Sequence, residues 1–170
     1  MRKYLSIALI FSFHLFFAQD HKLVSASSKD GKYSISQVKD WHVTFQSNGN
    51  EISIVAPLKN LDNIPAKINL TKEENLPKDF NLEMLTTRNT MLITKFLKAG
   101  TNELGSTTVS GQTAQWVTYT YEINETPFKG LSYFFIQNNI AYQITVAAPE
   151  NDFQGMEILF RQVAESVVVK

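Results

Sequence analysis

Histidines and carboxylates are the side chains of this sequence that could carry out acid–base chemistry. His42 follows Trp41 and lies two positions from Asp40. His42 and Asp40 are therefore the best candidate pair for such chemistry. Neighbouring residues of a strand point to opposite faces, and a serine hydrolase would also need an oriented histidine and an oxyanion hole. The sequence contains no G-x-S-x-G motif. We therefore expect His42 to be an ordinary strand residue and the protein not to be an enzyme.

Carboxylates gather in the central region, at Glu73, Glu74, Asp79 and Glu83. A calcium or zinc site would need oxygen ligands repeated through a loop, or histidines at fixed spacing. The four carboxylates instead fit a solvated loop and the start of a helix, whose dipole favours negative charge. The seven glycines are scattered and form no phosphate-binding loop. We expect no metal ion and no other cofactor.

Four residues are candidates for binding rather than for catalysis: Trp41, His42, Arg88 and Trp116. Aromatic side chains serve both hydrophobic cores and recognition surfaces. Arg88 and its neighbour Asn89 are unusual polar residues in the middle of a predicted helix. Arg88 either extends along the helix surface with its charge in water or binds an anion.

Trp116 lies in the stretch "SGQTAQWVTYTYE", which has the alternation of a strand. One face of that strand carries Val117, Tyr119 and Tyr121, which form the more continuous apolar row and are predicted to face the main core. Trp116 then shares the other face with Ala114, Thr118 and Thr120. On that face it either packs against a covering helix or lines a groove.

The first residues, "MRKYLSIALIFSFHLFFAQD", have the pattern of a secretory signal peptide. Two basic residues precede an apolar run from Leu5 to Phe17, which is shorter than the roughly 20 residues that span a membrane. Cleavage after Ala18 gives a signal peptide of residues 1–18, and a retained anchor is the alternative. We expect export to the periplasm or beyond the cell. A lipid-anchor cysteine is excluded, because the chain has no cysteine.

The remaining chain is predicted to be one domain, residues 32–170, preceded by a flexible polar leader at 19–31. Without Arg2 and Lys3 the chain keeps 14 basic residues against 16 acidic ones, and the charges are interspersed. This balance gives nucleic-acid binding little electrostatic support. With the signal peptide removed, no further segment predicts stable membrane insertion.

Strands are predicted from residue 32 onward, and two helices interrupt them. The first half contains the strands "YSIS", "HVTF", "EISIVAP" and "AKINLTKE", with a tight turn at Asn48-Gly49. A helix is predicted over about 80–98, with Asp79 as its N-cap. Its apolar stripe consists of Leu82, Leu85, Leu92, Phe96 and Leu97, with Asn89 in its middle.

The second half predicts strands at about 104–109, 113–122, 131–137 and 140–147, and a helix at about 151–165. Asn138-Asn139 predicts a two-residue hairpin that pairs Gln137 with Ile140, Phe135 with Tyr142 and Tyr133 with Ile144. Two helices and six to eight mostly antiparallel strands give an α+β domain.

These elements, taken in order, resemble the PsbP-like superfamily, which includes the photosystem II extrinsic protein and bacterial DcrB-like envelope proteins. The resemblance covers residues 32–169 and rests on four features: "W-x-V-x-F" at 41–45, an acidic-capped helix after Pro77, "G-Q-T-A-Q-W-V-T-Y" at 111–119, and a "Y-F-F-I … I-A-Y-Q-I-T-V-A-A-P" hairpin that leads into a final helix. It implies an α-β-α sandwich around a central, mostly antiparallel sheet.

The resemblance also implies a binding or assembly factor without catalytic residues, whose partner is another envelope or secreted protein. The metal-associated role of the photosynthetic members does not carry over, because no cluster of histidines and carboxylates matches it. The alternative function is a small-ligand carrier for a lipid or a sugar, with an aromatic-lined pocket near Trp41 or Trp116.

Overall fold

The computed structural model describes residues 22–58 and 64–170 of the chain. The elements follow the order β1 (Leu23–Ser27), β2 (Tyr33–Val38), β3 (His42–Ser47), β4 (Asn50–Val55), β5 (Lys67–Glu73), α1 (Leu82–Leu97), β6 (Gly100–Val109), β7 (Gln112–Ile123), β8 (Thr126–Gln137), β9 (Ile140–Pro149), α2 (Glu150–Glu165) and β10 (Val168–Val169). The signal peptide predicted for residues 1–18 lies outside the described residues. Neither described helix is long and apolar enough to cross a membrane.

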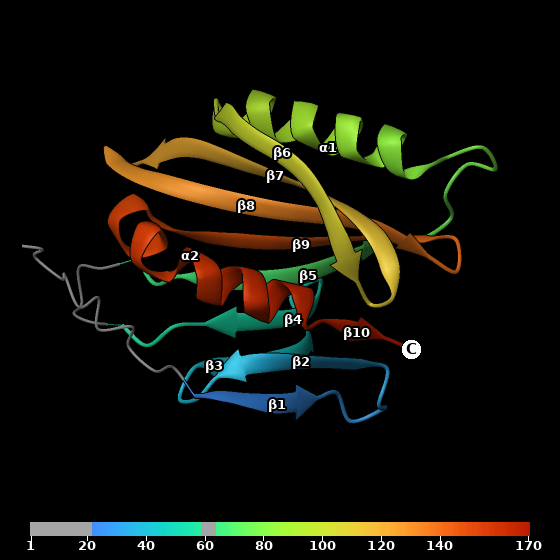
Figure 1. The fold of residues 1–170 in the computed structure, drawn as a ribbon, viewed down its shortest axis with the longest axis horizontal. Helices are drawn as coiled ribbons and strands as arrows, with labels where there is room; N and C mark the ends of the chain where they lie inside the picture. Colours follow the sequence, from blue (N-terminus) through green and yellow to red (C-terminus); the bar gives the residue numbers. More distant parts are fainter. Residues whose placement is uncertain (1–21, 59–63) are drawn as a thin grey trace, which may run out of the picture.

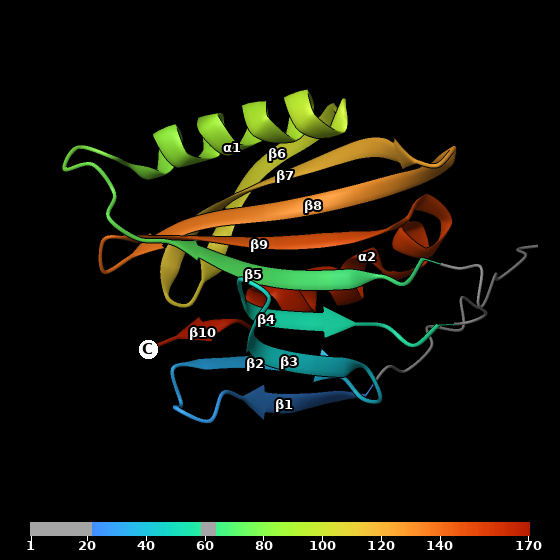
Figure 2. The same ribbon diagram turned by 180° about the vertical axis from the view of Figure 1, so that it is seen from behind.

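Seven strands form one antiparallel sheet in the order β3-β4-β5-β9-β8-β7-β6. A second, small sheet has the order β1-β2-β10. α1 covers one face of the large sheet, while α2 and the small sheet pack on the other (Figures 1 and 2). The predicted α+β class and the α-β-α layering are therefore confirmed.

The β8–β9 hairpin turns at Asn138-Asn139, as the sequence predicted. Both asparagines have positive φ angles, 53° and 60°, which a two-residue hairpin requires and asparagine tolerates. The register pairs Gln137 with Ile140 and continues through the predicted pairs 135↔142 and 133↔144. Alternation then directs one set of side chains toward α2 and the other set toward α1.

The main core lies between the large sheet and α2. Its largest fully buried side chains include Tyr133, Phe135, Phe153 and Phe160. Phe160 is 0% exposed, and its ring lies 5.2 Å from that of Phe153 and 6.2 Å from that of Trp41. A smaller core under α1 contains Leu85, Val117, Tyr119, Phe134 and Ala141.

Tyr119 lies directly across Gly130 of the neighbouring strand in the smaller core. A Cβ atom at Gly130 would come within 2.3 Å of two ring atoms of Tyr119. The aromatic ring therefore fills the space that a side chain on β8 would take. Gly105 and Trp116 form a second such pair on the other face, with the same 2.3 Å approach.

The predicted facing of β7 is wrong. Val117, Tyr119 and Tyr121 face α1 and the smaller core, whereas Trp116 and Thr118 face α2. The register with β8 decides this, because Trp116 lies opposite Tyr133 and Thr118 opposite Leu131. The row of apolar residues along this strand did not indicate which of its two faces would meet the larger core.

The predicted start and apolar stripe of α1 also need correction. Asn81, rather than Asp79, caps the helix, and its side chain accepts a hydrogen bond from the Met84 amide at 2.9 Å. Of the predicted stripe only Leu85 is buried, and Leu82 is partly buried. The sheet-facing line runs through Asn89, as predicted, and then continues to Ile93, at the 3–4-residue spacing of a helix. Leu92, Phe96 and Leu97 consequently remain exposed.

Ordered structure begins earlier than the predicted domain boundary. Residues 23–27, within the segment predicted as a flexible leader, form β1 and pair with β2 from Leu23↔Val38 to Ser27↔Ser34. The polar composition hid a short strand in which Leu23 and Ala26 pack against the main core.

Candidate functional site

Trp41 stands between β2 and β3 and is partly buried against the main core. Its ring meets Phe160 of α2 edge-on, at 6.2 Å between centroids. His42, the next residue, begins β3 opposite Val55 and is exposed.

Trp116 packs against α2, which is one of the two environments left open for it. The guanidinium of Arg161 lies 4.4 Å from the centre of its ring. Arg161 also donates a hydrogen bond to Glu157 at 2.9 Å, and Glu157 accepts another from Lys129 at 3.0 Å. Trp116 is thus covered by an ion-paired arginine, a favourable cation–π arrangement.

Arg88 lies on α1, across the sheet from both tryptophans. It donates to both carboxylate oxygens of Glu73, with 3.0 Å between Nη1 and Oε1, and its guanidinium lies 4.9 Å from the centre of the Phe80 ring. The four predicted binding residues are therefore not gathered in one site: two pack on α2, Arg88 lies on α1, and His42 is exposed at a strand start.

A small hollow lies beside Arg88, where α1 meets the ends of β5 and β9. It has a volume of about 170 Å³, and we call it the amide hollow after two carboxamides in its lining. Its lining residues are Thr71, Lys72, Glu73, Leu85, Asn89, Ala141, Tyr142 and Gln143. Asn89 Nδ2 donates to Gln143 Oε1 at 3.3 Å, which joins the helix to the sheet across the hollow.

Polar contacts continue from the amide hollow into the smaller core. Gln143 Nε2 donates to the Thr145 hydroxyl at 3.0 Å, and that hydroxyl lies 3.4 Å from the Ser132 hydroxyl. Ser132 in turn lies 3.3 Å from the Tyr119 hydroxyl. Burial raises the pKa of Tyr119, and the hydrogen bond with Ser132 offsets part of that effect. A polar line therefore crosses the α1 side of the sheet, from the surface to a buried phenol.

Exposed apolar side chains gather on α1. Of the eleven large apolar side chains that are exposed among the described residues, five lie on this helix, and we call them the α1 apolar surface: Met84, Met91, Leu92, Phe96 and Leu97. Phe96 is 73% exposed. Figure 1 shows α1 on the outside of the molecule, with the sheet beneath it. The helix thus offers apolar side chains to both the sheet and the solvent.

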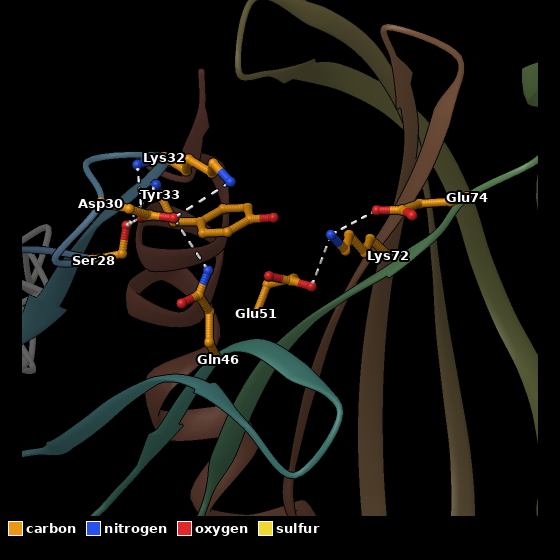
Figure 3. A network of polar contacts seen from close by, with 8 residues as sticks. All are labelled: Ser28, Asp30, Lys32, Tyr33, Gln46, Glu51, Lys72 and Glu74. Carbon is orange, nitrogen blue, oxygen red and sulfur yellow. Dashed lines mark hydrogen bonds and ion pairs between the residues drawn. The ribbon is translucent and has the colours of Figure 1, made fainter.

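A second polar network lies on the other side of β5, among β1, β2 and the β3–β4 hairpin (Figure 3). Lys72 forms ion pairs with Glu74 at 2.7 Å and Glu51 at 3.5 Å. Burial, followed by the neighbouring Glu51 carboxylate, raises the pKa of Tyr33. The described residues contain no group of three or more histidines, aspartates or glutamates placed to hold a metal ion.

Asp30 organises the turn between β1 and β2 in the same network (Figure 3). Its carboxylate accepts hydrogen bonds from the Ser28 hydroxyl at 2.6 Å and the Lys32 amide at 3.1 Å. The Ser28 oxygen in turn accepts from the Tyr33 amide at 3.0 Å. The hydrogen bonds that the Asp30 carboxylate accepts, first that from Ser28 and then that from the Lys32 amide, lower its pKa to about 2.

The change Asp30→Asn is expected to make stability less dependent on pH in acid. A carboxyl whose pKa is lowered by folding stabilises the protein above its unfolded value of 3.8, and this contribution is lost as pH falls toward about 2. Melting temperatures recorded between pH 7 and pH 2 should therefore differ most at neutral pH and converge near pH 2. Asp79→Asn, at an exposed loop position, measures the general effect of losing one negative charge. A difference that stays constant over the whole range would contradict this role of Asp30.

Comparisons with known proteins establish the fold. No family model matches the sequence, and no curated protein matches it significantly. Solved structures are similar, among them the cyanobacterial PsbP of Synechocystis (TM-score 0.65, 15% identity, 87% of this chain and 92% of that chain). LpqN of Mycobacterium tuberculosis, described as involved in cell envelope biogenesis, has a TM-score of 0.63 with 13% identity over 89% and 92%.

The Ran-binding protein Mog1p of Saccharomyces cerevisiae is also similar, with a TM-score of 0.61 and 8% identity over 88% of this chain and 96% of that chain. These likenesses confirm the PsbP-like fold that the sequence motifs predicted.

Two features of the site were missed by the sequence reading. The α1 apolar surface was hidden because three of its residues were assigned to the buried stripe. Nothing in the sequence paired Gln143 with Asn89, 54 positions away. The unusual polar pair Arg88-Asn89 was the one sequence signal that pointed to this region.

Proposed function

We propose that this protein is a non-enzymatic binding or assembly module that acts in the periplasm or outside the cell. The observation that carries the proposal is the α1 apolar surface, five large apolar side chains that are all exposed on one helix. Large exposed apolar patches on soluble proteins commonly mark interaction sites. The predicted signal peptide supports the location.

The partner that suits this surface is a protein with an apolar patch bordered by carboxylates. From the middle of α1 to its C-cap the charged side chains are all cations: Arg88, which is paired with Glu73, then Lys95 and Lys98. Lys95 Nζ lies 5.9 Å from the centre of the Phe96 ring, so cationic and apolar groups alternate closely there. Complementary charge fixes the orientation of partners, and buried apolar anchors supply most of the affinity.

The folds of LpqN and Mog1p lend support by analogy. The first is described as involved in envelope biogenesis and the second as Ran-binding. The same fold thus serves in proteins that are described by a process or a partner rather than by a reaction. Fold does not determine function, so the surface itself has to be tested.

Photo-crosslinking in the native host tests the surface directly. A photoreactive phenylalanine at position 96 is expected to form an adduct with one other protein, identified by mass spectrometry. Ile158 on α2 is the matched control site, because it is 76% exposed against 73% for Phe96. The adduct at position 96 should fall about tenfold when Met91→Asp places a charge in the surface, because desolvating that charge opposes docking.

Three outcomes would overturn this docking surface. Equal adducts from positions 96 and 158 would mean unselective contact. A lipid adduct alone would indicate a membrane, and an adduct of twice the chain mass would indicate self-association.

The alternative function, a lipid or sugar carrier, depended on tryptophans that line a pocket. Trp41 packs on Phe160, Trp116 lies under Arg161, and neither lines the amide hollow. At about 170 Å³ the hollow is also below the roughly 300 Å³ at which drug-sized ligand pockets begin. We therefore keep the binding module as the proposal.

A further inference from the structure

The amide hollow lies where α1 meets the sheet, a contact that proteins usually fill with apolar side chains. α1 contacts β6, β7 and β8, and the hollow lies on its flank toward β9 and β5. Here the helix contributes Asn89 and the strand contributes Gln143, while Leu85 and Ala141 supply the apolar part of the lining. A gap of about 170 Å³ therefore remains between polar groups that a closer apolar contact could have replaced.

The carboxamides of the hollow have unused hydrogen-bonding capacity. Each amide nitrogen has two hydrogens, and within the described chain Asn89 and Gln143 each donate one such bond from it. The Thr71 hydroxyl donates to the backbone carbonyl of Gln143 at 3.4 Å, and its oxygen can still accept a hydrogen bond.

Charges around the hollow are neutralised in pairs. Glu73 is bound by Arg88 through both oxygens, and Arg88 is further held against the Phe80 ring. Lys72 is paired with Glu74 and Glu51. A free anion or cation would have to displace one of these partners, whereas a neutral molecule would leave them in place.

From this arrangement we propose that the amide hollow binds a small neutral group that both donates and accepts hydrogen bonds, namely a carboxamide. Its free N–H groups on Asn89 and Gln143 suit the carbonyl oxygen, and the oxygen atoms of Thr71 and Gln143 suit the amide hydrogens. An engineered cavity of roughly 150 Å³ holds one benzene molecule, so the hollow has room for about six heavy atoms. The carboxamide belongs either to a free small molecule or to a side chain or acyl group of a larger partner.

Three probes of nearly the same shape but different charge test whether the hollow prefers a neutral group: acetamide, acetate and acetamidinium. Each is titrated into the isotope-labelled protein while the side-chain amide signals of Asn89 and Gln143 are followed by NMR. Acetamide is expected to shift both signals along a saturable curve, and the two ions are expected to bind at least tenfold more weakly. Equal responses to all three probes, or acetamide shifts that avoid residues 89 and 143, would overturn the proposal.

Two variants link the response to the hollow. Ala141→Leu adds an apolar side chain at its floor and should abolish acetamide binding while both amides remain. Thr94→Ala, at an exposed position of the same helix, should leave the binding unchanged. If Ala141→Leu lowers the melting temperature, Gln143→Leu provides a second test, read from the Asn89 signal alone. Unchanged acetamide binding in a folded Ala141→Leu or Gln143→Leu variant would contradict the site.

The source of the carboxamide is distinguished by size. A glutamine-containing tripeptide presents a primary carboxamide on a larger body, and N-acetylglucosamine presents a secondary one. A response to acetamide alone supports a free small molecule, and tighter binding of one larger probe assigns the group to a peptide or to a sugar. Because none of these readings involves the α1 apolar surface, the amide hollow and the proposed function can fail independently.

Discussion

Replacing Phe160 with alanine is expected to lower the free energy of unfolding by about 3–5 kcal/mol, the usual cost of deleting a buried phenylalanine ring. Phe160 is 0% exposed and contacts the rings of Trp41 and Phe153. Its loss would open a cavity between α2 and the sheet, where the surrounding backbone is held on both sides. Urea unfolding followed by circular dichroism measures the change, and Trp41 fluorescence should report the loss of its aromatic neighbour.

Phe96→Ala is the matched control, with the same substitution on the other helix. Phe96 is 73% exposed, so its removal should change the unfolding free energy by no more than about 0.5 kcal/mol. The same variant should weaken partner binding if α1 docks as proposed. A large loss of stability from Phe96→Ala would mean that its ring packs on the protein itself and would remove it from the α1 apolar surface.

Gly130→Ala is expected to destabilise the protein by about 1–3 kcal/mol through overpacking. The new Cβ would lie 2.3 Å from ring atoms of Tyr119, which is itself buried and lies near Ser132. The ring would have to move, and the polar line toward the amide hollow would lose its inner end. Thermal unfolding measures the loss, and the NMR signals of the Tyr119 ring should shift in the folded variant.

Gly155→Ala provides the opposite expectation for the same chemical change. Nothing lies within 4 Å of a Cβ atom at that position, which is on the exposed side of α2. Alanine is favoured over glycine in a helix by about 1 kcal/mol, so this variant should be more stable than the parent. Destabilisation by both variants to the same extent would show that a close approach to Tyr119 is not what requires glycine at 130.

Local signals predicted much of the fold. Asn138-Asn139 defined a hairpin because paired positive φ angles are possible for only a few residue types, and the turn then fixed the whole β8–β9 register. Asn48-Gly49 defined the β3–β4 hairpin for the same reason. The two helices were found from apolar spacing, α2 to within one residue of its start.

The two wrong predictions, for β7 and for α1, concern which side of an element faces which part of the core. The sequence of β7 showed two distinct faces, but both layers of this sandwich accept apolar side chains, so a contrast along one strand could not identify the main core. The stripe of α1 failed for a related reason, because apolar residues lie on more than one side of that helix. An exposed leucine and a buried leucine look the same in a sequence.

For the candidate site, single positions could be predicted from the sequence, but their contact partners could not. Arg88 and Asn89 stood out as polar residues within a helix, and both lie at the border of α1 that faces β5. Their partners, Glu73 and Gln143, depend on β5 lying beside β9, which no local pattern indicates. Trp41 and Trp116 were selected for their residue type, and both pack on α2.

The place of β5 beside β9 also determines when this sheet can be completed. Lys67 pairs with Ala147, and the two are separated by 80 positions in the chain. The hairpins of β6 to β9 join neighbours in sequence and can close soon after they are made, whereas a contact between distant residues first requires a large loop to close. Until then Ile68 and Leu70 of β5 lack their partners on β9, Val146 and Ile144. The strands of the first half of the chain can therefore join the sheet only after β9 has formed. We expect the pairing of β5 with β9 to be the step that limits the rate of folding.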